Sequence, residues 1–347
     1  MPSFNSPTVS IVVPVYNGGE HFYRCLNSLN QAAPRPDEII VVADGESDGC
    51  WRLAERLATR VIGLPITGGP ARARNHGARA ATGDILLFID SDVAVPSDIV
   101  GKITAMFTAD PHLSAVIGSY DDEPAETNFL SQYKNLLHHY VHQNAREEGF
   151  TFWGACGAVR REIFLALEGF DESYREPSIE DIELGYRLKR AGHKIRLAKE
   201  IQVTHLKRWE ALSLLKSDFF QRALPWTELA LQDRRLPDDL NLRRSSRLSA
   251  LLACGLTASV LVAFWNPKAL GITAVLALLL SSINAPLYLF FYRKRGARFT
   301  LRAIPWHWFY FLYGALAFSI GVFRFLVKRC VSRAFNGTKA VSPAGKS

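Results

Sequence analysis

The sequence predicts a chain in two parts, an α/β domain followed by an α-helical membrane domain. Up to about residue 205, short apolar runs alternate with segments of helical spacing, which is typical of a parallel sheet covered by helices on both faces. From Leu248 onward, three long runs carry no charged residue. The hydrophobic share of 48%, with 24 Gly and 17 Pro among 347 residues, excludes a disordered or collagen-like chain.

Each element of the first part follows from its pattern and from the turn residues that end it. Strands are expected at Val9–Val15, 38–43, 61–64 and 84–89, because these runs are apolar and end in turn residues. Helices are expected from 22 to 29, 49 to 58 and 70 to 81. Ligands of such sheets bind where the strands end. Polar residues fall at three of these ends: Tyr16 and Asn17, Asp44, and Asp90 with Asp92.

The three uncharged runs, 248–265, 269–292 and 305–323, each hold about 18 residues or more, enough to cross a bilayer as a helix. Arginines precede the first run and follow the second, whereas the loop between them offers only Lys268. The positive-inside rule then predicts a hairpin with both ends in the cytoplasm. If the third run crosses the bilayer, Lys328 and Arg329 lie on the non-cytoplasmic side, against the positive-inside rule. The sequence therefore allows two orientations of this run, across the bilayer or partly in the membrane interface. The alternative is that the three runs form helices buried in the core of a soluble protein.

The N-terminal part carries no secretory signal pattern, because 1–8 is polar and Val9–Val15 is too short, so we expect that part in the cytoplasm. Residues 209–232 show helical amphipathicity, which suits a helix in the membrane plane or one packed on the soluble domain. We therefore expect a soluble domain, interfacial or linker helices, about three membrane helices and a polar tail. Their ranges are 1–208, 209–246, 247–330 and 331–347.

Cysteine usage and charge exclude several classes of protein. The five cysteines lie far apart without a Cys-x-x-Cys pair, which excludes a disulfide scaffold and a zinc ribbon and indicates reduced thiols. The net charge of +8 predicts an anionic partner: nucleic acid, an acidic membrane face or a phosphorylated substrate. The basic residues cluster beside the apolar runs rather than with aromatic residues on a soluble face, which argues against nucleic acid.

Two acidic pairs and a histidine suggest chemistry. Asp90 and Asp92 follow a buried strand and could hold Mg²⁺ or Mn²⁺ at a diphosphate, although Asp and Ser are also common turn residues. His205 is a candidate third ligand or a structural histidine. Glu180 and Asp181 begin a helix, where an acid either suits the helix dipole or takes a proton from an attacking hydroxyl.

Two further patterns involve arginines and histidines. Gly68-Gly69 opens a helix with Arg72, Arg74 and Arg79 on or just before it, which makes a natural anion site, although it is no Walker A loop. His138 and His142 stand one helical turn apart without an evident partner ligand, so we expect no metal there.

Several motifs follow one another in a set order between about Thr8 and Trp209. They are the strand ending Pro14-Val-Tyr-Asn17, Asp44-Gly-Glu-Ser-Asp48-Gly49, Ala73-Arg74-Asn75, Asp84 to Asp92, Gly154-Ala155, Gly169-Phe-Asp171, Glu180-Asp181-Ile-Glu183 and Val203-Thr-His205. Taken in this order, they resemble the motifs of the family 2 inverting glycosyltransferases of the GT-A fold. The departures are Gly18-Gly19, where many members carry Glu, and Glu46, where Ser is usual.

The resemblance implies a Rossmann-like domain that binds a nucleotide sugar, and it implies roles for single residues. Asp181 would be the catalytic base, with Glu180 beside it. Asp90, Asp92 and His205 would hold Mg²⁺ or Mn²⁺. The substrate-binding residues implied are Pro14, Tyr16, Asn17, Asp44, Asp48, Arg74, Asp90, Trp153, Gly154, Arg208 and Trp209, with Tyr16 and Asp44 at the base and Arg74 near the diphosphate.

The implied activity is metal-dependent, inverting transfer from a UDP- or GDP-sugar to a lipid-linked or glycan acceptor, by a multi-pass protein of the inner or plasma membrane. Two other enzymes stay open, a polyprenyl-phosphate sugar transferase and a processive polysaccharide synthase. The processive motif Q/R-x-x-R-W reads His205-Leu-Lys-Arg208-Trp209 here, and no span precedes the domain, which favours transfer of a single sugar. A membrane scaffold with an inactive domain would be expected to lack the acidic motifs, which are present.

Overall fold

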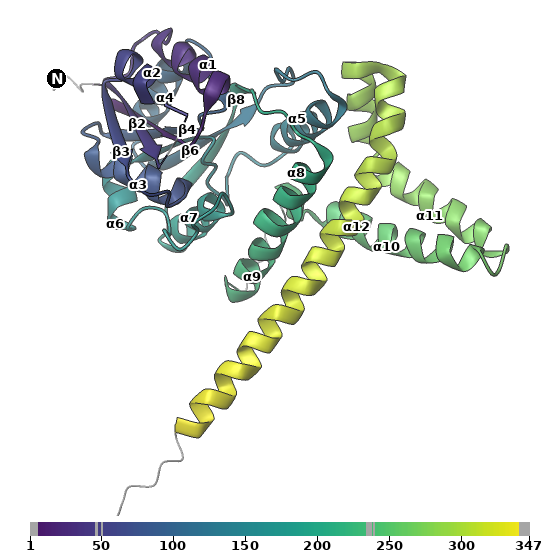
Figure 1. Cartoon of the computed structure of the whole chain (residues 1–347). Helices are drawn as coiled ribbons and strands as arrows, with labels where there is room; N and C mark the ends of the chain where they lie inside the picture. The colour runs from purple at the N-terminus through teal and green to yellow at the C-terminus, as the bar shows by residue number, and fades with distance from the viewer. Residues whose placement is uncertain (1–5, 46–47, 50, 234–237, 239, 340–347) are drawn as a thin grey trace, which may run out of the picture. The chain divides into compact units, whose positions relative to one another are not determined.

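Eight strands form one sheet in the order β3-β2-β1-β4-β7-β6-β8-β5 in the computed structural model (Figure 1). The structure describes residues 6–339 apart from 46–47, 50, 234–237 and 239, with only the backbone described from 331. The strands are β1 (Val9–Val15), β2 (Glu38–Asp44), β3 (Arg60–Leu64), β4 (Ile85–Ile89), β5 (Val93–Ala94), β6 (Leu113–Tyr120), β7 (Cys156–Arg160) and β8 (Lys194–His205).

The first half of the sheet is parallel, as the sequence predicts, and the second half is mixed. β1 pairs with β2 and β4 in parallel, and β2 pairs with β3 in the same way. β7 runs antiparallel to both β4 and β6, so the sheet is mixed beyond the four strands that the sequence predicts. The first strands fit the prediction because every residue of β1 and β4 is buried, which is typical of parallel strands covered on both faces.

Seven helices of the described chain each contact at least one strand of this sheet. They are α1 (Gly19–Asn30), α2 (Trp51–Leu57), α3 (Pro70–Ala80), α4 (Ile99–Ala109), α5 (Phe129–Gln143), α6 (Arg161–Ala166) and α7 (Glu180–Arg190). α3 begins at Pro70 after Gly69, whose φ of 91° favours glycine. The strand ends, the second turn of α3 and the first turn of α7 carry the acidic and basic residues of the candidate site.

Gly77 lets α3 approach β1 closely. A Cβ atom on Gly77 would lie 2.4 Å from Val12 Cγ1 and 3.2 Å from Val42 Cγ2. We expect Gly77→Ala to lower the free energy of unfolding by about 1–3 kcal/mol, because overpacking outweighs the gain in helix propensity. Gly63→Ala in β3 is the matched control, since a Cβ atom on Gly63 would have nothing within 4 Å. Thermal denaturation in detergent gives the melting temperature of each variant. Equal melting temperatures for Gly77→Ala and Gly63→Ala would contradict the packing argument.

The chain divides into two compact units. The first comprises Met1–Leu214, Asp239–Asn241 and Leu289–Phe299, and the second comprises Leu215–Asp238, Leu242–Tyr288 and Thr300–Ser347. The first unit therefore includes a segment, 289–299, that comprises the end of the second apolar run and the residues just after it. The remaining helices are α8 (Ala211–Lys216), a π-helix (Ser217–Ala223), α9 (Leu224–Asp233), a 3₁₀ turn (Leu240–Leu242), α10 (Arg244–Ala263), α11 (Ala269–Ile283) and α12 (Ala285–Lys339).

The second unit holds the apolar helices. α10 packs on α11, and a core of Ala253, Leu256, Leu280 and Phe311 joins both to α12. Ser249 accepts a hydrogen bond from the Asn284 amide at 3.0 Å. α10 and the 285–330 part of α12 are long and apolar enough to cross a membrane by length and composition, whereas α11 has 15 residues. α12 combines the end of the second apolar run with the third, and its helical geometry is interrupted at Gly296.

Candidate active site

Asp44 ends β2 and fixes the turn that leads into α3. Its carboxylate is buried and accepts hydrogen bonds from the backbone N–H groups of Gly68, at 2.9 Å, and Gly69, at 2.8 Å. Each carboxylate oxygen of Asp44 therefore already accepts a hydrogen bond from the protein backbone. The predicted role of Asp44 at the nucleotide base stays a prediction, and its observed contacts hold the glycine turn in place.

Two loops at the ends of β1 and β2 are tied together. The Asp48 N–H donates to Asn17 Oδ1 at 3.3 Å, and the Gly19 N–H donates to Asp48 Oδ2 at 3.2 Å. Asn17 adopts a φ of 48°, and the Tyr16 side chain next to it is 57% exposed. Pro14 lies buried within β1. An exposed tyrosine at a sheet edge is available to a flat ring such as a nucleotide base.

Arg74 joins the two acidic motifs. The side chain lies in the second turn of α3, is 4% exposed, and extends one nitrogen to each of two carboxylates. Nη2 lies 2.6 Å from Asp90 Oδ1, and Nη1 lies 2.9 Å from Glu180 Oε1. Burial lowers the pKa of the Arg74 guanidinium, but the charges of Asp90 and Glu180 outweigh burial and raise it above its usual range. A charged buried arginine thus fixes the strand end of β4 against the start of α7.

Glu180 and Asp181 differ in their surroundings although they are neighbours. Glu180 is 4% exposed and accepts from Arg74 and from the Ser178 N–H, at 2.9 Å. Asp181 is half-buried, and its Oδ2 accepts from the Gly154 N–H at 3.0 Å while Oδ1 accepts from the Ile182 N–H at 2.7 Å. Asp181 is therefore the member of the pair that solvent or a substrate can reach.

Gly154 lies between Arg74 and Asp181. A Cβ atom there would lie 3.1 Å from Arg74 Cζ, which is tighter than most real contacts. The Gly154 N–H donates to Asp181, and the Gly154 backbone also lies against the buried Arg74 side chain. Gly154 therefore contacts both the candidate base and the buried arginine. The predicted substrate-binding residue Gly154 is thus brought together with Arg74, Asp90, Glu180 and Asp181.

Asp92 and His205 face each other. β5 pairs with β8 so that Val93 lies opposite His205, and the Leu206 N–H donates to the Asp92 carbonyl at 2.8 Å. Asp92 Oδ2 lies 3.8 Å from His205 Nε2, which is too long for a hydrogen bond. Carboxylate and imidazole across such a gap fit a divalent cation, because both are ligands of transition-metal ions.

Asp90 has a different partner from Asp92. Its Oδ1 is held by Arg74, so Asp92 and His205 are the better placed ligands of the predicted three. Within the described residues, no group of three His, Cys, Asp or Glu side chains could hold a metal ion. A cation bound here would need further ligands from water or substrate phosphate, which is how Mg²⁺ is commonly held.

Aromatic rings line up beside His205. Its ring stacks on Tyr120 with 4.3 Å between centroids, and Tyr120 meets Trp153 edge-on at 4.8 Å. Trp153 also contacts His138 at 4.9 Å, so this histidine packs in an aromatic cluster. Tyr120 was missed in the sequence, although the apolar run 113–117 before Gly118-Ser-Tyr120-Asp-Asp is a signal for a strand that ends there.

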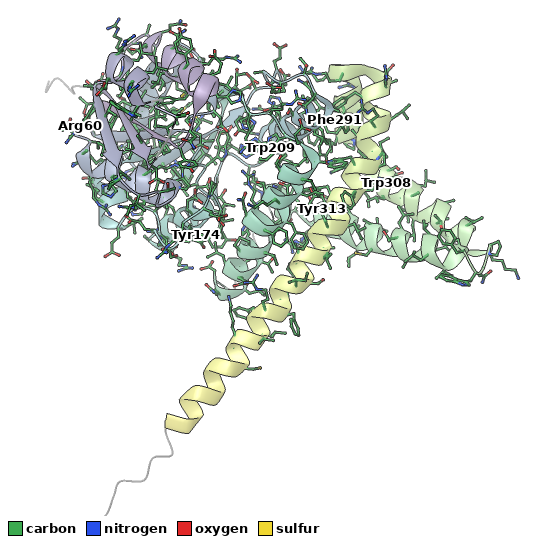
Figure 2. All side chains as sticks on the ribbon, in the orientation of Figure 1. Arg60, Tyr174, Trp209, Phe291, Trp308 and Tyr313 are labelled. Atoms are coloured by element: carbon green, nitrogen blue, oxygen red, sulfur yellow. The ribbon has the colours of Figure 1, made fainter. Side chains whose placement is uncertain are left out.

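Arg208 and Trp209 have separate contacts. The Trp209 ring is buried, and the Trp209 backbone N–H donates to Ser131 Oγ at 2.7 Å, which fixes the chain after β8 to α5 (Figure 2). Arg208 is exposed and pairs with Glu126, at 3.2 Å, and Glu210, at 2.8 Å. The structure places Trp209 near His205, with 6.3 Å between ring centroids, and leaves Arg208 on the surface.

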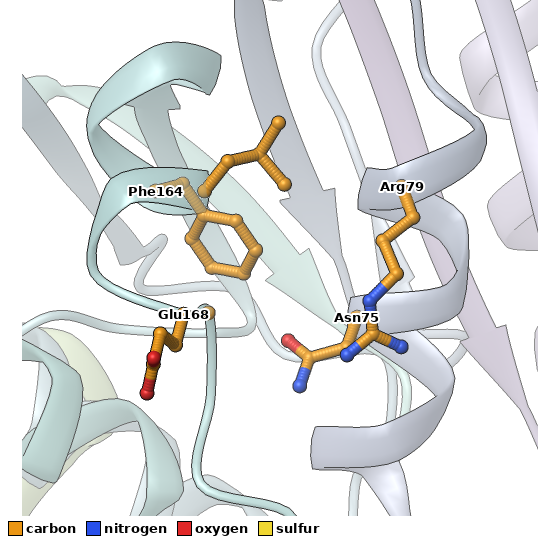
Figure 3. A pocket seen from close by; sticks show the side chains of 6 residues that line it. Asn75, Arg79, Phe164 and Glu168 are labelled. Carbon is orange, nitrogen blue, oxygen red and sulfur yellow. The ribbon is translucent and has the colours of Figure 1, made fainter.

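Two other features take no part in the acidic site. Burial raises the pKa of Cys156 to about 12, so this thiol stays protonated and is no nucleophile at neutral pH. A small pocket lies between α3 and α6 (Figure 3), with lining residues that include none of the acids described above. Its Asn75 instead holds Phe170, accepting from the Phe170 N–H at 2.9 Å.

Several known proteins resemble this chain in sequence. Residues 10–167 match the family model described as Glycosyl transferase family 2. The O-antigen chain rhamnosyltransferase RfbN of Salmonella typhimurium is 23% identical over 239 residues, which cover 63% of this chain and 74% of that protein. The uncharacterized glycosyltransferase YfnE of Bacillus subtilis is 26% identical over 257 residues, covering 56% of this chain and 64% of that protein.

A solved structure shares the fold. The mannosyltransferase PcManGT of Pyrobaculum calidifontis, in complex with GDP-Man and Mn²⁺, matches with a TM-score of 0.58 and 18% identity, over 91% of this chain and 88% of that one. At this identity the likeness concerns the fold. The match spans less than two thirds of YfnE.

Proposed function

We propose that this chain, whose residues 10–167 match the Glycosyl transferase family 2 model, uses a nucleotide-sugar donor and transfers one sugar, with inversion, to a hydroxyl of a lipid-linked or glycan acceptor at a membrane. The observation that carries the proposal is the separation of two acids. Asp181 is half-buried beside Gly154, while Asp92 faces His205. One acid is placed to take a proton and the other to bind a cation at the diphosphate.

The proposed reaction is a single displacement. The acceptor oxygen forms a bond to the anomeric carbon as the bond from that carbon to the diphosphate oxygen breaks. The electron pair of the broken bond stays on the diphosphate, and the hydroxyl proton passes to the Asp181 carboxylate. Because the hydroxyl attacks opposite the leaving group, the anomeric configuration inverts.

We assign donor binding to the edge of the sheet where β1, β2 and β4 end. Tyr16 is exposed for contact with the base, and Asp44 holds the Gly68-Gly69 turn before α3. Asp92 and His205 would hold Mg²⁺ or Mn²⁺, and a bound cation neutralises the charge of the departing nucleotide diphosphate. Arg74 keeps Asp90 and Glu180 in position by pairing with both.

We also propose that the apolar helices of the second unit anchor the enzyme in the inner or plasma membrane, with catalysis on the cytoplasmic side. α10 carries Arg243, Arg244 and Arg247 at its start, and Lys268 is the one cation in the loop before α11. This asymmetry favours the cytoplasm for the arginine-rich ends. An acceptor with a lipid tail would then meet the site from the leaflet.

The proposal is tested by incubating the purified full chain with radiolabelled UDP- and GDP-sugars, Mn²⁺ and bacterial membrane lipid. We expect one donor to place label in the lipid extract. The linkage is then probed with mild acid, which cleaves a glycosyl phosphate and spares an ordinary glycoside. Label that stays in the lipid or is released within a larger glycan supports a hydroxyl acceptor, whereas label released as the free monosaccharide would show that a polyprenyl phosphate is the acceptor. Long water-soluble products would indicate a processive synthase.

A further inference from the structure

We propose that the third apolar segment, 305–323 within α12, lies along the membrane surface on the catalytic side and does not cross the bilayer. The inference rests on the proposed membrane anchoring. It assigns a lipid-binding surface, the α12 stripe, which consists of the exposed residues Phe309, Leu316, Ile320, Phe323 and Val327. Its partner is the acyl region of the leaflet that faces the catalytic domain.

The chain just before this segment is held on the catalytic unit. Arg295 donates from Nε to Gln132 Oε1 at 2.6 Å and from Nη2 to the Asp122 carbonyl at 2.7 Å. Lys294 forms an ion pair with the Asp122 carboxylate, and the Phe291 ring lies 6.0 Å from that of Tyr133. All these residues belong to the first unit. The third apolar segment therefore starts on the catalytic side of the membrane.

Beyond the start, α12 runs beside the π-helix and α9. The Tyr313 hydroxyl (Figure 2) donates to Asp218 Oδ2 at 2.8 Å. A Cβ on Gly321 would lie 2.9 Å from Thr227 Cβ, so the two backbones approach closely there. Later residues of the π-helix and α9 contact later residues of α12, because Asp218 meets Tyr313 and Thr227 meets Gly321. The two helices therefore lie side by side and point in the same direction.

The far end of the segment is tied to α9 by charge. Glu228 pairs with Lys328 at 2.6 Å and with Arg324 at 3.2 Å. The side of the membrane on which Glu228 lies is therefore the side on which Arg324 and Lys328 lie.

α9 is on the catalytic side for two reasons. First, the stretch from Lys216 to Asp233 contains five charged residues, too many for a helix that crosses lipid. Second, Leu240 belongs to the first unit and packs against its core, only seven residues after Asp233. Seven residues span about 25 Å at most, which is less than the hydrocarbon thickness of about 30 Å. Both ends of the 305–323 segment are thus on one side.

A helix with both ends on one side of a bilayer can lie in the interface. Within α12 the backbone departs from helical geometry at Gly296, which precedes the 305–323 segment. The segment itself is one continuous helix, so it cannot enter the bilayer and turn back to the same side. The spacings of the α12 stripe are 7, 4, 3 and 4 residues, which place its members on one helical face. Phe311, on the opposite face, is buried in the α10–α11 core. Tyr313 lies on the stripe's own face between Phe309 and Leu316, where it is buried and donates to Asp218 of the π-helix.

Charge at both ends suits an anionic leaflet. Arg298 and Arg302 are exposed before the segment, and Arg324, Lys328 and Arg329 follow it. An apolar stripe with cations at its ends is typical of helices that lie at the boundary between headgroups and acyl chains. The orientation also removes the conflict with the positive-inside rule, because Lys328 and Arg329 then stay on the cytoplasmic side.

The depth of three positions on the stripe tests the inference. The full chain, with its other accessible cysteines replaced by serine, carries a nitroxide at Phe309→Cys, Leu316→Cys or Phe323→Cys in phosphatidylethanolamine–phosphatidylglycerol vesicles. Power saturation with oxygen and a water-soluble nickel chelate gives the depth of each label. We expect one shallow depth for all three. A crossing helix would instead place Leu316→Cys about 10 Å deeper than Phe309→Cys and Phe323→Cys, at 1.5 Å per residue.

Leu251→Cys and Ala258→Cys on α10 are the matched control, because both side chains are exposed and lie on one face of a helix that we propose to span. The label at Ala258→Cys should lie deeper than the label at Leu251→Cys, because Ala258 is near the middle of the uncharged run. A graded depth along α12 would overturn the surface orientation and leave the anchoring intact. Labels exposed to water at all five positions would overturn the anchoring itself.

Native Cys330 gives a second readout, because its side chain is exposed and it follows Arg329 directly. In vesicles whose active sites face outward, an impermeant maleimide should label Cys330 and should not label Asn266→Cys, placed between α10 and α11 in a Cys330→Ser chain. Protection of Cys330 together with labelling of Asn266→Cys would contradict the inference.

Discussion

Asp181→Asn is expected to lower turnover about 10²–10⁴-fold and to leave donor binding nearly unchanged. The amide keeps the shape of the side chain, and its oxygen can still accept from the Gly154 N–H, which lies 3.0 Å away in the native protein. It cannot take the proton of the acceptor hydroxyl. Initial rates with labelled donor measure turnover, and calorimetric titration measures donor binding.

Two neighbours separate catalysis from helix capping in this experiment. Glu183→Gln is the matched control in the same first turn, because Glu183 pairs with Arg187 at 2.7 Å and touches neither Arg74 nor Gly154 in the described contacts. It should retain most of the activity. If Asp181 only capped α7, Asn would cap nearly as well and Asp181→Asn would turn over like the native enzyme.

Glu180→Gln should behave differently from both. It leaves the buried Arg74 with one carboxylate partner instead of two, so we expect a lower melting temperature as well as a lower rate. A turnover loss at Glu180→Gln without a change in melting temperature, together with normal turnover at Asp181→Asn, would assign the base to Glu180.

Asp92→Asn is expected to lower turnover roughly 10²–10³-fold, equivalent to several kcal/mol of stabilisation of the departing diphosphate. Removal of divalent cations with EDTA should have a comparable effect on the native enzyme, and Mn²⁺ should restore it. Asp98→Asn is the control, because Asp98 pairs with Lys102 at 2.9 Å on the surface.

Donor binding gives a readout of the same site that does not depend on turnover. In the native protein, Mn²⁺ should strengthen nucleotide-sugar binding measured by calorimetry, and Asp92→Asn should remove this dependence. Full turnover in EDTA, or an unchanged effect of Mn²⁺ on binding to Asp92→Asn, would show that Asp92 is not a cation ligand.

The parallel half of the fold could be predicted because its signals are local. β1, β2 and β4 are mainly apolar, and an Asn or Asp stands at the end of each strand or within two residues after it, so the strands and their ends are visible in the sequence. The family resemblance rests on the same strand ends and is confirmed by the family match at 10–167.

The antiparallel half depends on pairings between residues far apart in the chain. β7 is only five residues long, and it lies between β4 and β6 because of tertiary packing. The partnership of Asp92 with His205 likewise arises from the pairing of β5 with β8, which brings together residues more than a hundred positions apart. No local pattern specifies such a register.

The contacts of individual charges were the least accessible to prediction. Arg74 was placed near the diphosphate by resemblance, whereas the structure pairs it with Asp90 and Glu180. The sequence shows three charges in three separate motifs, and only the fold decides which of them pair. The same holds for Glu228 with Arg324 and Lys328, which decides our view of the third apolar segment.

The configuration of the new glycosidic bond tests the central claim most directly, because a single displacement assisted by Asp181 must invert the anomeric carbon. Once the donor screen has identified the sugar, the product is made with donor labelled with ¹³C at the anomeric carbon, and NMR coupling constants give its configuration. We predict that an α-linked donor yields a β-linked product, made at a greatly reduced rate by Asp181→Asn. Retention of the donor configuration would contradict the account.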